Sequence, residues 1–376
     1  MPVAVFHPEY RAYTFGGDHP FSPVRIDMVF SLLEEVGFPV EFVQPPAATD
    51  EELLLVHGEA YLEAVAAASA EGGVGDPSKG LATPDNPIVR GVDAGARRMV
   101  GGTLHGARLI ADGRERTVLQ MGGGLHHAFA GLASGFCIFN DLAIAIRELV
   151  ERGLNVAYLD VDVHHGDGVQ TIFYDDEHVM TISLHESGEY LFPGTGWAHE
   201  LGQGMGRGFK LNVPLEPFTE GDSYLEVLEK TVEPALSYFR PDVLVFQAGS
   251  DAHFSDPLAD LRLTTQDFER IFRAVKRYAG QYTGGRLLTT LGGGYSLSAT
   301  PRIWTLLYLV LFDLPVFDEL PQAWLDRWAH ELGPNPPATL HDPPDPYDPI
   351  PRREEITRHN RRMVERLNDA VSMLWL

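Results

Sequence analysis

The stretch Tyr158-Leu159-Asp160-Val161-Asp162-Val163-His164-His165-Gly166-Asp167-Gly168 joins an apolar run, Val156 to Leu159, to a dense row of carboxylates and imidazoles. Side chains alternate across a strand, so Asp160, Asp162 and His164 would point to one side. Burying such a row is costly unless something compensates its charge, and a divalent metal does so. A solvated loop with ion pairs is the alternative for a single Asp-x-Asp pair. The added imidazoles and the third aspartate favour a metal site.

Several other motifs follow predicted strands in the same way. The strands expected to carry them are Thr117–Gln120, Val156–Leu159, Val243–Gln247 and Arg286–Thr290. Apolar strands that alternate with helices are typical of a parallel sheet covered on both faces. Ligands of such sheets bind beyond the carboxyl ends of the strands. The motifs lie at those ends: Gly122 to His127, Asp160 to Gly168, Ala248 to His253 and Gly292 to Tyr295.

The remaining sequence predicts a regular succession of elements. Further strands are expected at Val3–Phe6, Val40–Gln44 and Val179–Leu184. Helices are expected at Pro23–Val36, Asp50–His57, Tyr61–Ser69, Val89–Ala111, Asn140–Glu151, Ser223–Phe239, Thr265–Ala279 and Glu354–Leu374. Long loops are expected at Glu71–Pro87 and Gly188–Gly208; loops of such length are usually functional or disordered.

The C-terminal part begins with an unusual composition. Residues 333–351 include eight prolines and predict an extended surface segment. The helix after it is expected to dock back on the body of the protein. Because no internal repeat and no sharp break in composition occurs, we expect one domain over residues 1–376.

Charge and composition narrow the classes of partner. The net charge of −24 argues against binding to nucleic acid or anionic membranes. It favours cationic partners such as lysine-rich peptides or polyamines, although acidity can serve solubility alone. The lone Cys137 excludes an internal disulfide and fits a cytoplasmic location. The first residues lack a signal-peptide pattern, and Ile303–Phe312 is too short to span a bilayer.

The motifs, in their order, resemble the zinc-dependent histone deacetylase superfamily, which includes bacterial acetoin-utilisation deacetylases and acetylpolyamine amidohydrolases. The resemblance extends over Pro23 with Arg25, Gly122–His127, Ser134–Cys137 with Asn140 and Asp141, Asp160–Gly168, Ser183–His185, Phe192–Gly196, Asn212–Pro214, Ala248–His253 with Asp256 and Pro257, and Gly292–Tyr295. It implies a single α/β/α domain with a central, mostly parallel eight-stranded sheet, the fold shared with arginase. The run after Asp251 resembles the bacterial and class II branches more than class I.

By this resemblance, Asp162, His164 and Asp251 hold the catalytic zinc. One imidazole and two carboxylates can hold a tetrahedral metal and leave positions for water and substrate. The oxygen-rich set also suits iron(II). The resemblance further implies structural potassium. A first site would use Asp160, Asp162, His164, Ser183 and Leu184, and a second the backbone carbonyls of Phe173, Asp176, Val179 and Phe209.

The resemblance also implies metal-assisted amide hydrolysis. His127 would take a proton from water and later protonate the leaving amine, while His126 acts as an orienting and electrostatic partner. Asp160 and Asp167 would be the carboxylates that pair with these two histidines. Tyr295 would donate a hydrogen bond to the substrate carbonyl and stabilise the developing oxyanion.

The implied substrate is a long aliphatic amine that carries a small acyl group. Its predicted contacts are Phe136, Phe192, Gly135 and Gly293, with Asp85 as the candidate that grips the substrate backbone and Arg25 near the acetate exit. Acetyl-lysine in proteins is the expected substrate and an acetylpolyamine the alternative. An arginase-like ureohydrolase fits less well, because it usually needs two manganese ions and more aspartates. A non-catalytic acyl-amine binder would typically lack a metal ligand, a histidine or the tyrosine, and all are present.

Overall fold

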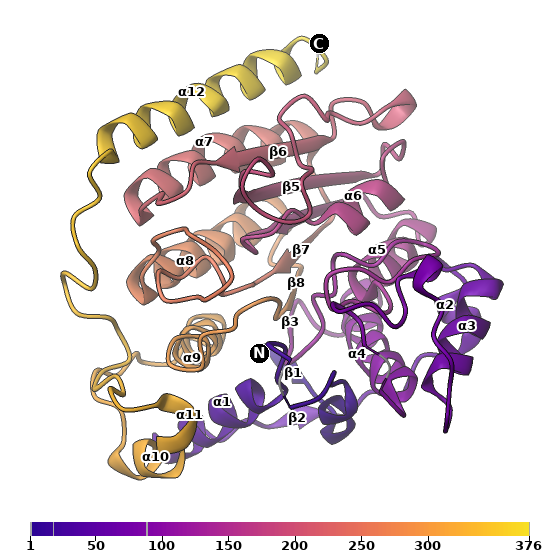
Figure 1. The fold of residues 1–376 in the computed structure, drawn as a ribbon. Helices are drawn as coiled ribbons and strands as arrows, with labels where there is room; N and C mark the ends of the chain where they lie inside the picture. The colour runs from indigo at the N-terminus through magenta and orange to yellow at the C-terminus, as the bar shows by residue number, and fades with distance from the viewer. Residues whose placement is uncertain (1, 18, 88, 376) are drawn as a thin grey trace.

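A single eight-stranded sheet forms the centre of the computed structural model, which describes residues 2–17, 19–87 and 89–375 (Figure 1). Its strands are β1 (Val3–Val5), β2 (Phe42–Val43), β3 (Thr117–Gln120), β4 (Val156–Asp160), β5 (Val179–Glu186), β6 (Lys210–Leu215), β7 (Val243–Gln247) and β8 (Leu287–Thr290). Their order is β2-β1-β3-β8-β7-β4-β5-β6, and all seven neighbouring pairs are parallel. The predicted fold class, an α/β protein with an eight-stranded sheet between helical layers, is confirmed.

Helices cover both faces of the sheet (Figure 1). One face carries α4 (Val92–Ala111), α5 (Asp141–Glu151) and α6 (Asp167–Ile172). The other carries α1 (Val24–Glu35), α9 (Thr300–Leu311), α8 (Thr265–Tyr282), α7 (Gly221–Phe239) and α12 (Arg353–Ser372). The remaining α-helices of the described residues are α2 (Asp50–Leu53), α3 (Glu59–Ser69), α10 (Gln322–Arg327) and α11 (Ala329–Leu332).

Strand β4 shows why the central strands are apolar throughout. Val156 and Tyr158 pack with α4 and α5, whereas Ala157 and Leu159 pack in the core on the other face. A strand covered on both sides has no solvent face that could hold polar residues. Each fully buried valine or leucine contributes about 1.5–3 kcal/mol. The polar residues therefore begin only where the strand ends, at Asp160.

Strand β6 was not predicted. Its sequence, Lys210 to Leu215, alternates polar and apolar residues and contains Pro214, which lacks the N–H of a central strand. The structure accommodates the proline because β6 lies at the edge of the sheet and pairs only with β5. Strand β5 also continues to Glu186, beyond the predicted end at Leu184.

The proline-rich segment is less exposed than predicted. Leu340 and Asp342 are buried, and Asp342 Oδ1 accepts a hydrogen bond from Arg302 at 2.9 Å. The other oxygen of Asp342 lies 2.8 Å from His253 Nε2. Proline-rich composition disfavours helix and strand, but it does not prevent single side chains from entering the core. After this segment, α12 lies beside α7 (Figure 1).

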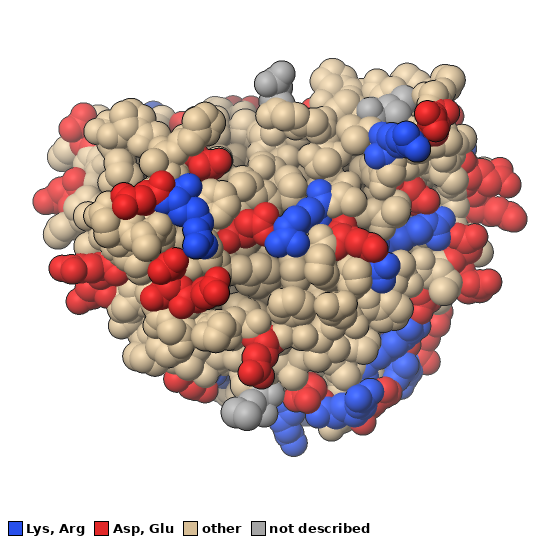
Figure 2. All heavy atoms as spheres, turned by 90° about the horizontal axis from the view of Figure 1, so that it is seen from below, with Lys and Arg blue, Asp and Glu red and all other residues tan. Residues whose placement is uncertain are grey.

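The surface is acidic in the view of Figure 2, where Asp and Glu are spread across the face and Lys and Arg lie mostly beside them. Ion pairs occur between surface groups, for example Arg327–Glu35 at 3.5 Å. Among the described helices, none has the length and apolar character needed to cross a membrane.

Candidate metal centre and active site

Four neighbouring strands, β3, β8, β7 and β4, end in one row. Gln120 is in register with Thr290, Thr290 with Gln247, and Gln247 with Asp160. Since the strands are parallel, the four loops that follow them leave the same edge of the sheet. These loops carry the motifs that the sequence predicted at strand ends.

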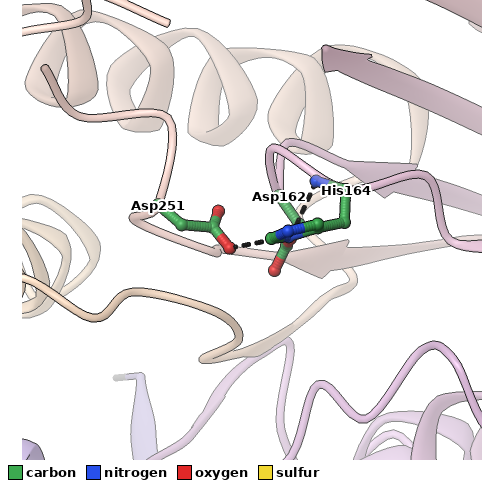
Figure 3. Close-up of side chains that lie close together, drawn as sticks. All are labelled: Asp162, His164 and Asp251. Carbon is green, nitrogen blue, oxygen red and sulfur yellow. Dashed lines mark hydrogen bonds and ion pairs between the residues drawn. The ribbon is translucent and has the colours of Figure 1, made fainter. Parts of the chain in front are cut away.

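Three buried side chains converge at this edge (Figure 3). Asp162 and His164 lie in the loop after β4, and Asp251 lies in the loop after β7. His164 Nδ1 is 3.1 Å from Asp162 Oδ1 and 3.2 Å from Asp251 Oδ2. One donor atom from each residue lies within 4.8 Å of the others. Two carboxylates and one imidazole fit a divalent cation such as zinc or iron(II).

The two carboxylates are held by further hydrogen bonds. Asp162 Oδ2 accepts from Gln247 Nε2 at 2.7 Å and from the Gly293 N–H at 2.8 Å. Asp251 Oδ1 accepts from the Val163 N–H at 2.8 Å. In each carboxylate these hydrogen bonds hold one oxygen, and the other oxygen faces His164. Donors around a metal site commonly orient its ligands in this way.

The sequence interpretation included one of these two neighbours, Gly293, and omitted the other. Gln247 was not singled out, although a polar residue that ends an apolar strand is a usable signal. Gly293 lines the pocket and also donates its N–H to Asp162, so its predicted contact with the substrate stays a prediction. A Cβ at this position would be 2.0 Å from Asp251 Oδ2, so the backbone approaches this closely only because residue 293 is glycine.

The charges of the three residues shift one another's pKa values. Burial lowers the pKa of His164, but the hydrogen bonds and charges of Asp162 and Asp251 outweigh it and raise this pKa to about 10. Burial and the charge of Asp162 raise the pKa of Asp251. In the metal-free protein the imidazole is therefore protonated at neutral pH.

Metal binding is expected to release about one proton per site at pH 7, because a metal ligand must give up its proton. His164 is protonated below its raised pKa, so apparent zinc affinity should increase with pH by about tenfold per unit in that range. Calorimetric titration with zinc in two buffers of different ionisation enthalpy measures the released proton. Equal heats in both buffers would contradict this expectation.

Paired histidines lie beside the metal centre, in the loop after β3. His126 Nδ1 is 2.8 Å from Asp160 Oδ2, and His127 Nδ1 is 2.7 Å from Asp167 Oδ1. The two rings are 4.0 Å apart between centroids. Each Nδ1 has a carboxylate partner, which leaves Nε2 as the nitrogen free for chemistry.

The two histidines have opposite pKa shifts. Burial lowers the pKa of His126, but the charges of Asp160 and Asp162 outweigh it and raise it to about 9. Burial and the neighbouring charge of His126 lower the pKa of His127 to about 4, against the pull of Asp167. At neutral pH His126 is thus a cation and His127 a neutral base.

Two residues at the start of α5 fix the histidine loop. Asp141 accepts hydrogen bonds from the N–H groups of Gly124 at 3.1 Å and Leu125 at 2.7 Å. Asn140 caps α5 through the Ala143 N–H and donates to the Ala128 carbonyl at 2.9 Å. The family resemblance includes Asn140 and Asp141 without a predicted role, because the contact depends on how α5 packs against the loop.

A narrow pocket of about 20 Å³ leads to these groups. It is lined by Phe21, Gly123, Gly124, Leu125, His126, His127, Gly135, Phe136, Cys137, Asp162, His164, Gly292, Gly293 and Tyr295.

The ring of Phe192, which is 42% exposed, lies 5.0 Å from that of His127. The ring of Phe136 lies 5.8 Å from that of Tyr295. Asp256 Oδ2 accepts the Tyr295 N–H at 2.7 Å and so fixes the tyrosine backbone.

The remaining predicted contacts lie on opposite sides of the pocket. Arg25 is buried and donates to the Gly294 carbonyl at 2.7 Å, beneath the glycine run after β8. Asp85 is exposed, and its carbonyl lies 3.2 Å from His19 Nε2. The His19 ring packs 4.4 Å from that of Phe136, which places this backbone near the pocket rim. The grip of Asp85 on a substrate stays a prediction.

The predicted monovalent-cation sites have different surroundings. Asp160 and Ser183 are in register on neighbouring strands, and both are buried. The oxygen atoms at this position are suitable donors for potassium, and the first potassium site stays a prediction. Of the second set, the Asp176 and Val179 carbonyls accept hydrogen bonds from the side chain of Lys210.

A buried metal centre with paired histidines at the edge of a parallel sheet is typical of a metal-dependent hydrolase. The sequence profile described as "Histone deacetylase domain" matches residues 19–311. This protein therefore belongs to the histone deacetylase family and is a hydrolase of the deacetylase class.

Two groups of relatives resemble nearly the whole chain. "Acetoin utilization protein AcuC" of Bacillus subtilis is 40% identical over 98% of this chain and 97% of its own length. The protein of the same name from Staphylococcus aureus is 39% identical over 96% and 94%. A crystal structure of an HDAC homolog complexed with SAHA is 28% identical, with a TM-score of 0.86 and coverage of 97% and 99%. That of an HDAC homolog from Aquifex aeolicus is also 28% identical, with a TM-score of 0.84 and coverage of 96% and 99%.

Proposed function

We propose that this protein removes the acetyl group from the side-chain amine of acetyl-lysine in proteins and releases acetate. The observation that carries the proposal is the pairing of a neutral histidine with the Asp-His-Asp centre in one narrow pocket. The relatives named AcuC support a role in the acetoin-utilisation branch of the family. The lone, buried Cys137 supports a cytoplasmic location.

We propose zinc as the metal held by Asp162, His164 and Asp251. When bound, it would supply Lewis acidity toward the acetyl carbonyl and toward a water molecule. His127 Nε2 takes the proton of that water, and Asp167 holds the ring in the orientation that this requires. The same nitrogen then returns the proton to the leaving amine. His126, paired with Asp160, supplies positive charge beside the reacting groups.

Tyr295 would stabilise the oxyanion. Burial keeps its pKa well above the usual value, so its hydroxyl remains a hydrogen-bond donor throughout the physiological range. Phe136 and Phe192 would flank the methylene chain, which is apolar and gains from contact with two rings. Arg25 would stabilise a leaving acetate near the buried end of the pocket.

We favour acetylated protein over acetylpolyamine because the run after Asp251 resembles the bacterial and class II branches of the family. The net charge of −24 attracts either cationic substrate.

A substrate panel on the zinc-loaded protein tests the proposal. We expect kcat/KM for an acetyl-lysine peptide to exceed that for N-acetylspermidine or N-acetylputrescine by at least tenfold. Peptides with residues on both sides of the acetyl-lysine should be better substrates than acetyl-lysine alone. A preference for acetylpolyamines would replace the proposed substrate, and zinc binding without turnover of any acetyl amine would indicate a binding module.

A further inference from the structure

Lys210, the first residue of β6, has a buried side chain with none of its surface exposed. Its Nζ donates hydrogen bonds to the Val179 carbonyl at 2.5 Å and to the Asp176 carbonyl at 3.1 Å. Lysine is almost never fully buried unless its amine is paired. The two carbonyls lie in the turn after α6 and at the start of β5. Lys210 thus joins the edge strand to this turn.

The same two carbonyls belong to the predicted second potassium site, and their surroundings do not fit a bound cation. Such a site needs carbonyl oxygens to replace the hydration shell of the ion. Two of the four predicted carbonyls accept from Lys210. The other two each accept one backbone N–H group, Phe173 O from Asp176 at 3.1 Å and Phe209 O from Thr181 at 2.9 Å. A carbonyl oxygen has two lone pairs, so it is the Lys210 amine that occupies the site.

The position of the Lys210 nitrogen, and not the local charge, is what excludes a cation here. Burial lowers the pKa of Lys210 to about 7, opposed by the charges of Asp176 and Asp175. The nitrogen fills the space between the carbonyls whether or not it carries its third proton, so a cation is excluded sterically in either state. The Asp176 carboxylate is itself fixed by Arg147 at 3.0 Å and by the His178 N–H at 2.9 Å.

We propose that the side-chain amine of Lys210 stands where the family resemblance predicts the second monovalent cation, and that this protein binds no potassium at these carbonyls. A covalently attached amine then holds the turn between α6 and β5 at any potassium concentration. This turn closes the element that begins with Asp167, the partner of His127. The contact of Lys210 with the two carbonyls therefore supports Asp167 and His127 without an ion from solution.

Rubidium, which scatters anomalously, serves as the probe for potassium. Crystals of the zinc-loaded wild-type protein grown in rubidium chloride should show no anomalous peak in contact with the Asp176 and Val179 carbonyls. Crystals of the Lys210→Ser variant should show one, because serine removes the amine and opens the space. Lys230→Ser is the matched control, since Lys230 is an exposed lysine paired with Glu226, and it should behave as wild type.

A rubidium peak at these carbonyls in the wild-type protein would overturn the proposal. So would a folded Lys210→Ser variant without a peak there. As a second measurement, the melting temperature of Lys210→Ser should rise more steeply with potassium concentration than that of wild type, by mass action on the opened site. Equal slopes for the two proteins would also count against it. If Lys210→Ser fails to fold, the wild-type crystals alone still decide whether a cation binds.

Discussion

Replacing His127 by alanine is expected to lower kcat on an acetyl-lysine peptide by about 10²- to 10⁴-fold, the usual contribution of a general base. His127 is the neutral member of the pair, with a pKa held at about 4, so it accepts a proton at neutral pH. Protonation removes this base only as the pH falls toward that value. Metal content, measured by mass spectrometry, should stay at the wild-type level because His127 is not a metal ligand.

Two variants control this result. His330→Ala changes an imidazole that is 98% exposed and should leave kcat unchanged. His126→Ala should be less damaging than His127→Ala, because His126 contributes charge and orientation rather than proton transfer. Wild-type turnover by His127→Ala would refute the assignment of the base. A larger loss in His126→Ala would exchange the two proposed roles.

Replacing Asp251 by asparagine is expected to weaken zinc binding by more than the 10- to 100-fold that is typical for a partner outside the metal shell. Asparagine keeps the shape of the side chain but removes the charge that the cation requires. Turnover at limiting zinc should fall in parallel. Competition with a zinc-binding dye measures the affinity, and added zinc should restore part of the activity.

The matched control for this change is Asp313→Asn, which alters a carboxylate that is 83% exposed and paired with Lys276. Its zinc affinity and turnover should equal those of wild type. An Asp251→Asn protein that binds zinc as tightly as wild type, with its circular dichroism spectrum unchanged, would remove Asp251 from the proposed ligand set.

Local features of the sequence were sufficient to locate the main strands. The predicted ranges of β3 and β7 equal the observed ones, because a strand buried on both faces is a short apolar run that polar residues end abruptly. β6 was missed because an edge strand tolerates Lys210 and Pro214, which break that pattern. The buried position of Asp342 was missed for a related reason: composition describes a segment and not its single side chains.

The contacts around the candidate metal centre could not be predicted from the sequence. Gln247 holds Asp162, and Asp141 holds the histidine loop, through contacts between residues 85 and 16 positions apart in the chain. The same applies to Lys210, whose amine reaches carbonyls that precede it by more than 30 residues. Spacing along the chain gives no measure of such distances.

By itself, the sequence determined that the candidate carboxylates and histidines follow apolar strands, because alternation along a strand and the apolar run before it are local properties. Only the tertiary structure decided that the third, eighth, seventh and fourth strands are neighbours, in that order, with their last residues in one row. Strand order depends on how helices far apart in the chain pack over the sheet, and that packing brings Asp251 to His164.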